Sequence, residues 1–286
     1  MSDGDIEQAR RWFAEELRFV ARVGDPRVVE AFATVPRERF IGPGPLRILS
    51  SWNMKEYWTP PNAGPAAAYH DVLIAYDEQR WLNNGQPSLW AFVFDKLHVA
   101  AGEHVIHLGC GMGYYTAVLA ELVGRGGAIT AIEIDERLAN RARKALAPWS
   151  QVGMVNGDGA QHSLPESDVV VASAGATHPL LAWLRCLRPN GRLAFPMTST
   201  TAGGGMLLVT RHGPDAFEAR FLCPVWFYDF AGARDAAVSD RLAKALAEDR
   251  GAGVKSVRTD RHAEDASCWL HGEGWCLSRC QADPVQ

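Results

Sequence analysis

The stretch that decides the fold runs from Val105 to Gly113 and reads VIHLGCGMG. Its apolar beginning is typical of a buried strand, and three glycines at alternate positions follow before a helical pattern begins at Tyr114. Glycine has no Cβ, so a ligand can approach the backbone closely, and the next helix begins with unpaired N–H groups. Alone, the pattern fits either a ligand-binding loop or a tight turn that binds nothing.

Short apolar strands alternate with helices around this loop, which indicates a parallel sheet built from βα units. The expected fold class is therefore α/β, with a doubly wound, Rossmann-like sheet. Strands are predicted at 104–108, 128–134, 152–156, 168–173, 192–196, 206–210 and 219–225, and helices at 89–97, 114–122, 137–146, 179–187 and 239–248.

Two helices are predicted before the sheet. Apolar residues three and four positions apart give one over 5–23, and Asp25 followed by Pro26 starts the next, which ends at Pro36. Repeated glycines and prolines over 42–68, Pro43 among them, predict an irregular lid. The expected organisation is N-terminal helices and lid over 1–80, a cofactor-binding Rossmann-like domain over 81–225 and a C-terminal extension over 226–286.

Composition limits the partners. The 286 residues are 47% hydrophobic and 22% charged, ordinary values for a folded globular protein. Lys+Arg 29 against Asp+Glu 33 leaves no basic excess for a polyphosphate backbone, so no nucleic acid partner is expected. No apolar run approaches the length that spans a bilayer, so no membrane partner and a cytoplasmic location are expected. The oligomeric state stays open.

Acids follow two of the predicted strands. Glu133 ends the second strand, where a carboxylate can accept both hydroxyl hydrogens of a ribose. Asp158 stands in a Gly-Asp-Gly turn after the third strand, where it can accept from an adenine amine. The alternative is that both acids only cap the next helices. The G-x-G-x-G spacing, the Gly-Asp-Gly turn and the lack of a second glycine loop favour S-adenosylmethionine over a nicotinamide dinucleotide.

An ordered set of motifs points to a known family. Over about residues 5–225 the sequence resembles the protein-L-isoaspartate O-methyltransferases, a branch of the class I S-adenosylmethionine-dependent methyltransferases. The resemblance rests on Asp25–Phe32, Val35–Phe40, Tyr69-His70-Asp71, Gln86-Pro87, Leu108–Tyr114, Gly157-Asp158-Gly159, and Asn190–Leu193 with Pro196.

The resemblance implies roles for the cofactor residues. The loop that holds Gly109, Cys110, Gly111 and Gly113 would line the methionine part of the cofactor. Glu133 would hold the ribose, and Asp158 with Gly159 would hold the adenine.

The sequence departs from the family pattern at two positions. Gly85 stands where the family has a serine beside the methyl donor and the acceptor carboxylate. His107 stands where the family has an acid that helps to hold the cofactor's ammonium group, and a charged imidazolium there would repel it. His107 is either a cofactor contact or an imidazole packed in the strand.

The acceptor site is predicted around the altered segment. Asn83 and Asn84 are candidate catalytic residues because their amides can bind a carboxylate, although a plain turn explains them equally. His178 is a third candidate, as a general base or as the start of a helix. Aromatic side chains can stabilise a sulfonium and exclude water, or pack the lid. The expected substrate-binding residues are Tyr69, Tyr76, Trp81, Asn84, Gly85 and Ser173.

The expected activity is S-adenosylmethionine-dependent methyl transfer to a carboxylate or other polar group of a small molecule or modified peptide. One alternative is isoaspartyl protein repair. Another is cleavage of a different sulfonium bond, with release of methylthioadenosine, and a third is a non-catalytic binder of the cofactor.

Cysteines gather near the C-terminus. Cys268, Cys276 and Cys280 with His271 could bind a metal, but their spacing matches no common zinc pattern. The sequence therefore predicts free thiols and no metal.

Overall fold

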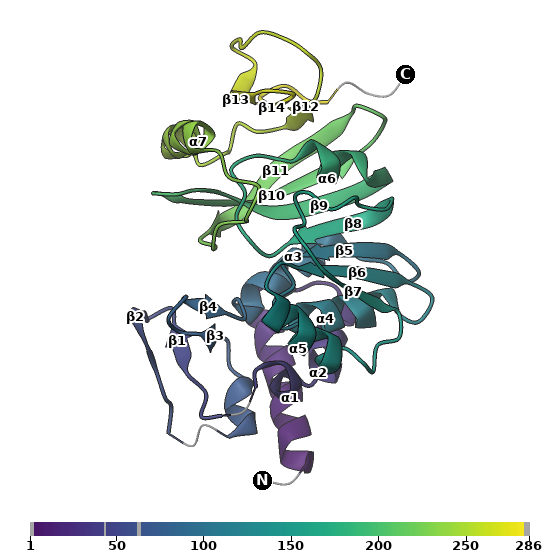
Figure 1. The fold of residues 1–286 in the computed structure, drawn as a ribbon, viewed down its shortest axis with the longest axis vertical. Coiled ribbons are helices and arrows are strands. Elements are labelled where there is room, and N and C mark those ends of the chain that lie inside the picture. Colours follow the sequence, from purple (N-terminus) through teal and green to yellow (C-terminus); the bar gives the residue numbers. More distant parts are fainter. Residues whose placement is uncertain (1–2, 43, 62–63, 283–286) are drawn as a thin grey trace. The chain divides into compact units, whose positions relative to one another are not determined.

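Figure 1 shows the computed structural model, which describes residues 3–42, 44–61 and 64–282. The chain forms two compact units. Unit 1 comprises Met1–Glu103, Cys110–Ala131 and Asp135–Val155, and unit 2 comprises His104–Gly109, Ile132–Ile134 and Asn156–Gln286. The three-part organisation expected from the sequence stays a prediction.

Unit 1 holds five α-helices among its described residues. The Asp25 carboxylate caps α2 by accepting from the backbone N–H of Arg27 at 2.9 Å, and Pro26 fixes the first helical φ. Both predicted N-terminal helices are confirmed. The helices are α1 (Asp3–Val20), α2 (Pro26–Thr34), α3 (Pro87–Leu97), α4 (Tyr114–Val123) and α5 (Glu136–Ala145).

The segment predicted as an irregular lid instead contributes to a small antiparallel sheet of order β2-β1-β3-β4. The glycines and prolines lie at the ends of the segment, and residues 46–59 contain neither, so strands can form there. Pro43 lies outside the described residues. The elements are η1 (Arg37–Phe40), β1 (Ile48–Ser50), β2 (Asn53–Trp58), η2 (Pro65–Ala68), β3 (Leu73–Asp77) and β4 (Leu82–Asn83).

The large sheet has ten strands in the order β13-β14-β12-β11-β10-β9-β8-β5-β6-β7. Parallel pairing of β8 with both β5 and β9 confirms the doubly wound α/β class. The strands are β5 (His104–Leu108), β6 (Ala128–Glu133), β7 (Val152–Asn156), β8 (Ser167–Ala172), β9 (Leu187–Ser199), β10 (Gly203–Arg211), β11 (Phe217–Val225), β12 (Ser256–Arg258), β13 (Cys268–Gly272) and β14 (Trp275–Ser278).

Unit 2 departs from the sequence prediction at one helix and also holds strands that the sequence did not predict. The helix predicted at 179–187 is only the short α6 (Leu181–Arg185), because Leu187 already begins β9. The tail carries the expected helix, α7 (Ala236–Asp249), but its Trp- and Cys-rich segment forms a β-hairpin, β13–β14, that pairs with β12. These three strands extend the antiparallel end of the sheet, and their ribbons are drawn in the yellow of the chain's C-terminal part in Figure 1.

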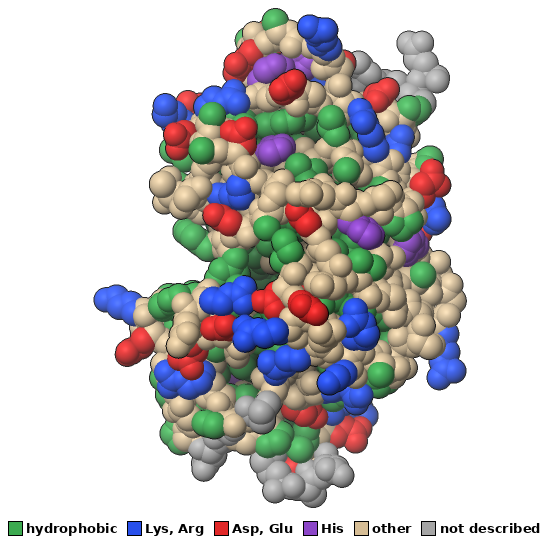
Figure 2. All heavy atoms as spheres, viewed as in Figure 1, with side chains coloured by type: hydrophobic (Ala, Val, Ile, Leu, Met, Phe, Trp, Pro, Cys, Tyr) green, Lys and Arg blue, Asp and Glu red, His purple; other side chains and the backbone are tan. Residues whose placement is uncertain are grey.

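Within the described ranges, no helix is long and apolar enough to cross a membrane. Figure 2 shows basic and acidic side chains intermixed on the face in view. The mixture matches the small net charge of −4.

Candidate functional site

Backbone hydrogen bonds in unit 2 join the strand ends where ligand-binding residues were expected. The Gly109 N–H donates to the Ile132 carbonyl at 2.8 Å, and the Ser173 N–H donates to the Leu108 carbonyl at 2.8 Å. β5 and β8 are neighbours although β6 and β7 separate them in the sequence, so their carboxyl ends mark the point where strand order reverses. In doubly wound sheets ligands bind at this point.

His107 lies in β5 and is fully buried. Its Nε2 is 2.8 Å from the hydroxyl oxygen of Ser173. Burial lowers the pKa of His107 to about 3, so the imidazole is neutral at pH 7. The repulsion that an imidazolium would exert on a positively charged ligand is therefore absent, and Ser173 is engaged by the strand histidine.

The two predicted acids lie at successive turns of unit 2. Glu133 is only 6% exposed, and its backbone carbonyl accepts from the Gly157 N–H at 3.0 Å and from the Asn156 side-chain amide at 2.8 Å. One carboxylate oxygen of Asp158 accepts from the Ala160 N–H at 2.9 Å. These bonds fix Glu133 beside the Gly157–Gly159 turn. The predicted alternative, that both acids cap the next helices, is wrong, because Asp135 caps α5 and Asp158 is followed by a turn instead of a helix.

The rest of the glycine loop belongs to unit 1. Gly111 and Gly113 have φ of +58° and +92°, a region that side chains with a Cβ rarely adopt. At Gly113, the residue before α4, an added Cβ would lie 2.8 Å from Leu146 Cδ1. Cys110 is buried, with its sulfur 3.7 Å from that of Met154. Glycine is thus required at Gly111 and Gly113 by the loop conformation, and at Gly113 also by the contact with Leu146.

Asn83 and Asn84 lie at the end of the small sheet and have different roles. The side-chain oxygen of Asn83 accepts from the Gly85 N–H at 3.0 Å. Asn84 is buried, and its side-chain oxygen accepts from the Ile74 N–H at 2.6 Å. Its side-chain nitrogen is also buried and has no hydrogen-bond partner among the residues that the structure describes. An unsatisfied buried donor is uncommon in native proteins.

Gly85 sits against an aromatic wall. Its φ is +73°, and an added Cβ would lie 2.9 Å from Trp90 Nε1 and 3.5 Å from Tyr115 Cε2. The Tyr115 hydroxyl donates to the Gly85 carbonyl at 2.9 Å, and the Trp90 and Tyr115 rings lie 5.3 Å apart. The space that a serine side chain would need is thus occupied by indole.

The three predicted aromatic substrate contacts differ in environment. The Tyr69 hydroxyl accepts from Arg10 Nε at 3.0 Å and also bonds Glu38, so Tyr69 is used in packing the N-terminal helices. Tyr76 lines a groove, and its ring lies 3.3 Å from the position of a Cβ on Gly111. Trp81 is 45% exposed. Of the predicted aromatic contacts, Tyr76 therefore lies beside the glycine loop. The Tyr69 hydroxyl is instead engaged by Arg10 and Glu38.

His178, the predicted general base, is stacked in unit 2. Its ring lies 5.5 Å from that of Trp275 at an interplanar angle of 15°. Its Nδ1 is 2.9 Å from the Thr177 hydroxyl, and burial lowers the pKa of the imidazole. This packing favours a structural role for His178.

Sequence reasoning missed residues that hold the acceptor segment. Tyr115 and Trp90 shape the space around Gly85, and Asp71 caps α3 by accepting from the Ser88 N–H at 2.8 Å and the Gln86 amide at 3.0 Å. The residues next to α3 give no sign of this role for Asp71. The only hint is that Gln86, the N-cap residue, makes no capping hydrogen bond with its side chain. A polar residue far upstream must then serve the helix N-terminus.

The glycine loop after β5 and the buried acid that ends β6 are the arrangement expected of a class I methyltransferase. The family model for protein-L-isoaspartate(D-aspartate) O-methyltransferase matches residues 10–232. The chain therefore belongs to this family of S-adenosylmethionine-dependent enzymes.

Individual relatives agree. A protein-L-isoaspartate O-methyltransferase of Brucella anthropi is 29% identical over 237 residues, covering 80% of this chain and 95% of its own. One from Methylorubrum extorquens is 32% identical over 217 residues, covering 74% and 84%. A Plasmodium falciparum structure, described as a protein-L-isoaspartate O-methyltransferase in complex with S-adenosyl-L-homocysteine, has a TM-score of 0.62 at 15% identity, covering 78% and 98%, and shares the fold.

Proposed function

We propose that this chain transfers a methyl group from S-adenosylmethionine to the free α-carboxylate of an isoaspartyl residue in a peptide or protein. The family match over residues 10–232 carries this proposal, because it spans every predicted cofactor and acceptor position. It favours the isoaspartyl acceptor over the small-molecule acceptor that the altered segment alone suggested, and it gives no support to non-methyl chemistry.

Bound S-adenosylmethionine supplies an electrophilic methyl group on a sulfonium. Glu133 accepts the ribose hydroxyls, and Asp158 with Gly159 holds the adenine. The loop that holds Gly109, Gly111 and Gly113 would line the methionine part. The positive φ of these glycines and the burial of Glu133 support this assignment. His107 stays neutral, so it tolerates the positive cofactor although it lacks the family's acid.

The acceptor needs orientation more than a base. The free α-carboxyl of an isoaspartyl residue, with a pKa of about 3.3–3.7, is already ionised at neutral pH, so transfer requires in-line placement and exclusion of water. The stacking of His178 on Trp275 is consistent with a reaction that uses no general base.

The cofactor assignment is tested by calorimetric titration with S-adenosylhomocysteine. Glu133→Gln should weaken binding by about 10–100-fold, since hydrogen bonds to a charged group contribute about 1.5–3 kcal/mol. The control is Glu136→Gln, an exposed residue three positions later, which should bind as the wild type does. Equal binding by all three proteins would exclude Glu133 from the cofactor site, and no binding by the wild type would defeat the proposal.

A further inference from the structure

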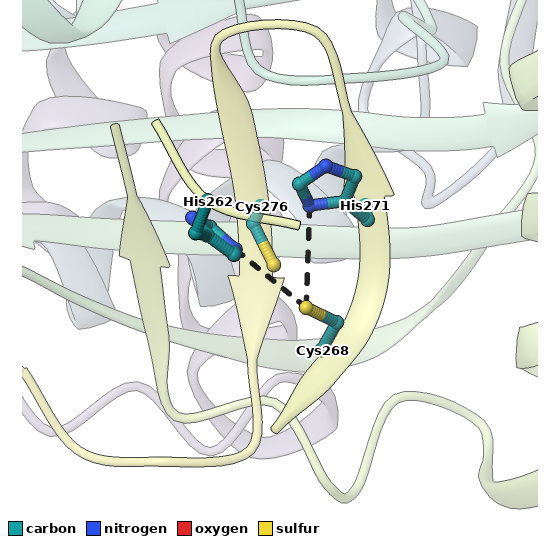
Figure 3. A group of neighbouring side chains, drawn as sticks. All are labelled: His262, Cys268, His271 and Cys276. Atoms are coloured by element: carbon teal, nitrogen blue, oxygen red, sulfur yellow. Dashed lines mark hydrogen bonds between the residues drawn. The ribbon is translucent and has the colours of Figure 1, made fainter. Parts of the chain in front are cut away.

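Four side chains with metal-binding atoms meet in the C-terminal extension, outside the residues that the family model matches. They are His262, Cys268, His271 and Cys276, and one ligand atom from each lies within 4.8 Å of all the others. Figure 3 shows them converging from the loop before β13 and from the two strands of the hairpin. We propose that they form a structural zinc site that fastens this extension.

The register of the hairpin explains how three of the ligands meet. His271 and Cys276 are direct partners across β13 and β14, so their side chains lie on the same face. Cys268 is three residues from His271, a spacing that puts side chains on opposite faces of a regular strand. The register shifts between Cys268 and Leu270, and this irregularity brings the Cys268 thiol to the face of His271.

His262 completes the set from the loop that joins β12 to β13. Its Nε2 is 3.6 Å from the sulfur of Cys268, and His271 Nδ1 is 4.0 Å from the same sulfur. A tetrahedral zinc with Zn–S of about 2.3 Å and Zn–N of about 2.0–2.1 Å holds its ligand atoms about 3.3–3.8 Å apart. The two sulfur–nitrogen separations therefore need a contraction of at most about 0.5 Å, and the widest pair of the four, at most 4.8 Å apart, needs one of up to about 1 Å.

The other ring nitrogen of His262 is already oriented. Nδ1 is 3.0 Å from the backbone carbonyl of Asp260 and 3.3 Å from its carboxylate. Histidines that bind zinc commonly donate their second ring N–H to a carboxylate or carbonyl, which fixes the ring and leaves the free nitrogen for the metal. Arg258 holds that carboxylate in turn, with Nη2 to Oδ2 at 2.7 Å.

Two thiolates and two imidazoles suit zinc better than magnesium or calcium, which prefer oxygen ligands. The ion would cross-link a loop without regular structure, residues 259–267, to the hairpin. The hairpin also carries Trp275, which stacks on His178. The zinc site thus stabilises the hairpin that positions Trp275 against His178.

Metal content tests the proposal. The full chain is purified under reducing conditions, incubated with Zn²⁺, dialysed and measured by mass spectrometry for zinc. We expect about one zinc per chain, falling at least about tenfold in the Cys268→Ser/Cys276→Ser variant. Cys280→Ser is the matched control, because this exposed thiol lies in the same extension but outside the four, and it should retain zinc. Zinc-free wild type, or equal zinc in all three proteins, would overturn the site.

A second measurement needs no variant and so does not depend on the double variant folding. Wild-type protein loaded with Co²⁺ should show the intense visible bands of tetrahedral cobalt and a thiolate-to-cobalt charge-transfer band. A pale octahedral spectrum, or a Cys268–Cys276 disulfide in protein isolated without oxygen, would contradict the proposal. Both readouts are independent of methyl transfer, so they test the zinc site separately from the proposed activity.

Discussion

Replacing Gly85 with serine restores the residue type of the family at this position, yet the structure predicts that it damages this chain. A residue with a Cβ at φ +73° costs about 1–2 kcal/mol. The new Cβ would also lie 2.9 Å from Trp90 Nε1, and Trp90 is only 1% exposed, so its ring cannot move into solvent. Overpacking of this kind costs about 1–3 kcal/mol. Gly85→Ser should therefore lower the free energy of unfolding by about 2–5 kcal/mol and should not raise methyl transfer.

Urea unfolding followed by tryptophan fluorescence measures this loss. Gly85→Ala separates the Cβ from the hydroxyl, and it should cost about as much as serine. Gly126→Ser is the matched control, because this exposed glycine has open space around its Cβ position and should stay within about 0.5 kcal/mol of the wild type. A Gly85→Ser variant as stable as the wild type, or one with faster methyl transfer, would refute the claim that Trp90 and Tyr115 leave no space for a side chain at this position.

Three further predictions concern polar side chains held by hydrogen bonds in the structure. His107 has a pKa near 3 when folded and about 6.5 when unfolded, so its contribution is full above pH 6.5 and is lost as pH falls toward 3. Between pH 7 and pH 5 the unfolding free energy of the wild type should fall by about 2 kcal/mol more than that of His107→Gln, and parallel losses in urea unfolding would contradict this. Asp71→Ala should cost about 1–2 kcal/mol by removing the cap of α3, while Asp71→Asn should cost less; equal losses in thermal unfolding would argue against capping. Tyr115→Phe removes the donor to the Gly85 carbonyl, so it should lower the free energy of unfolding by about 1–3 kcal/mol and raise the acceptor KM more than it lowers kcat. An unchanged KM in steady-state kinetics would show that Tyr115 does not position the acceptor segment.

The sheet and its glycine loop could be predicted because their signals are local. Apolar runs such as 104–108 are buried on both faces in a parallel sheet, so the strands appear directly in the sequence. The small sheet was missed because β2 exposes nearly all of its side chains and so lacks the alternation of a half-buried strand.

The contacts that shape the candidate sites are not local. The Tyr115 hydroxyl reaches a carbonyl 30 residues away, which no spacing rule describes. His262 joins Cys268 through a loop, and Cys268 joins His271 only because the strand register shifts. A search for zinc spacing therefore selected Cys280, which is exposed and lies outside the cluster, and overlooked His262.

The most direct test of the central claim is competition between two isomers of one peptide, identical except that one contains isoaspartate and the other aspartate. The purified chain is incubated with both and with S-adenosylmethionine, and the products are separated by liquid chromatography and identified by mass spectrometry. The account predicts one methyl ester on the isoaspartyl isomer, an equal amount of S-adenosylhomocysteine and no ester on the aspartyl isomer. Bound cofactor with neither peptide methylated, or release of methylthioadenosine, would contradict it.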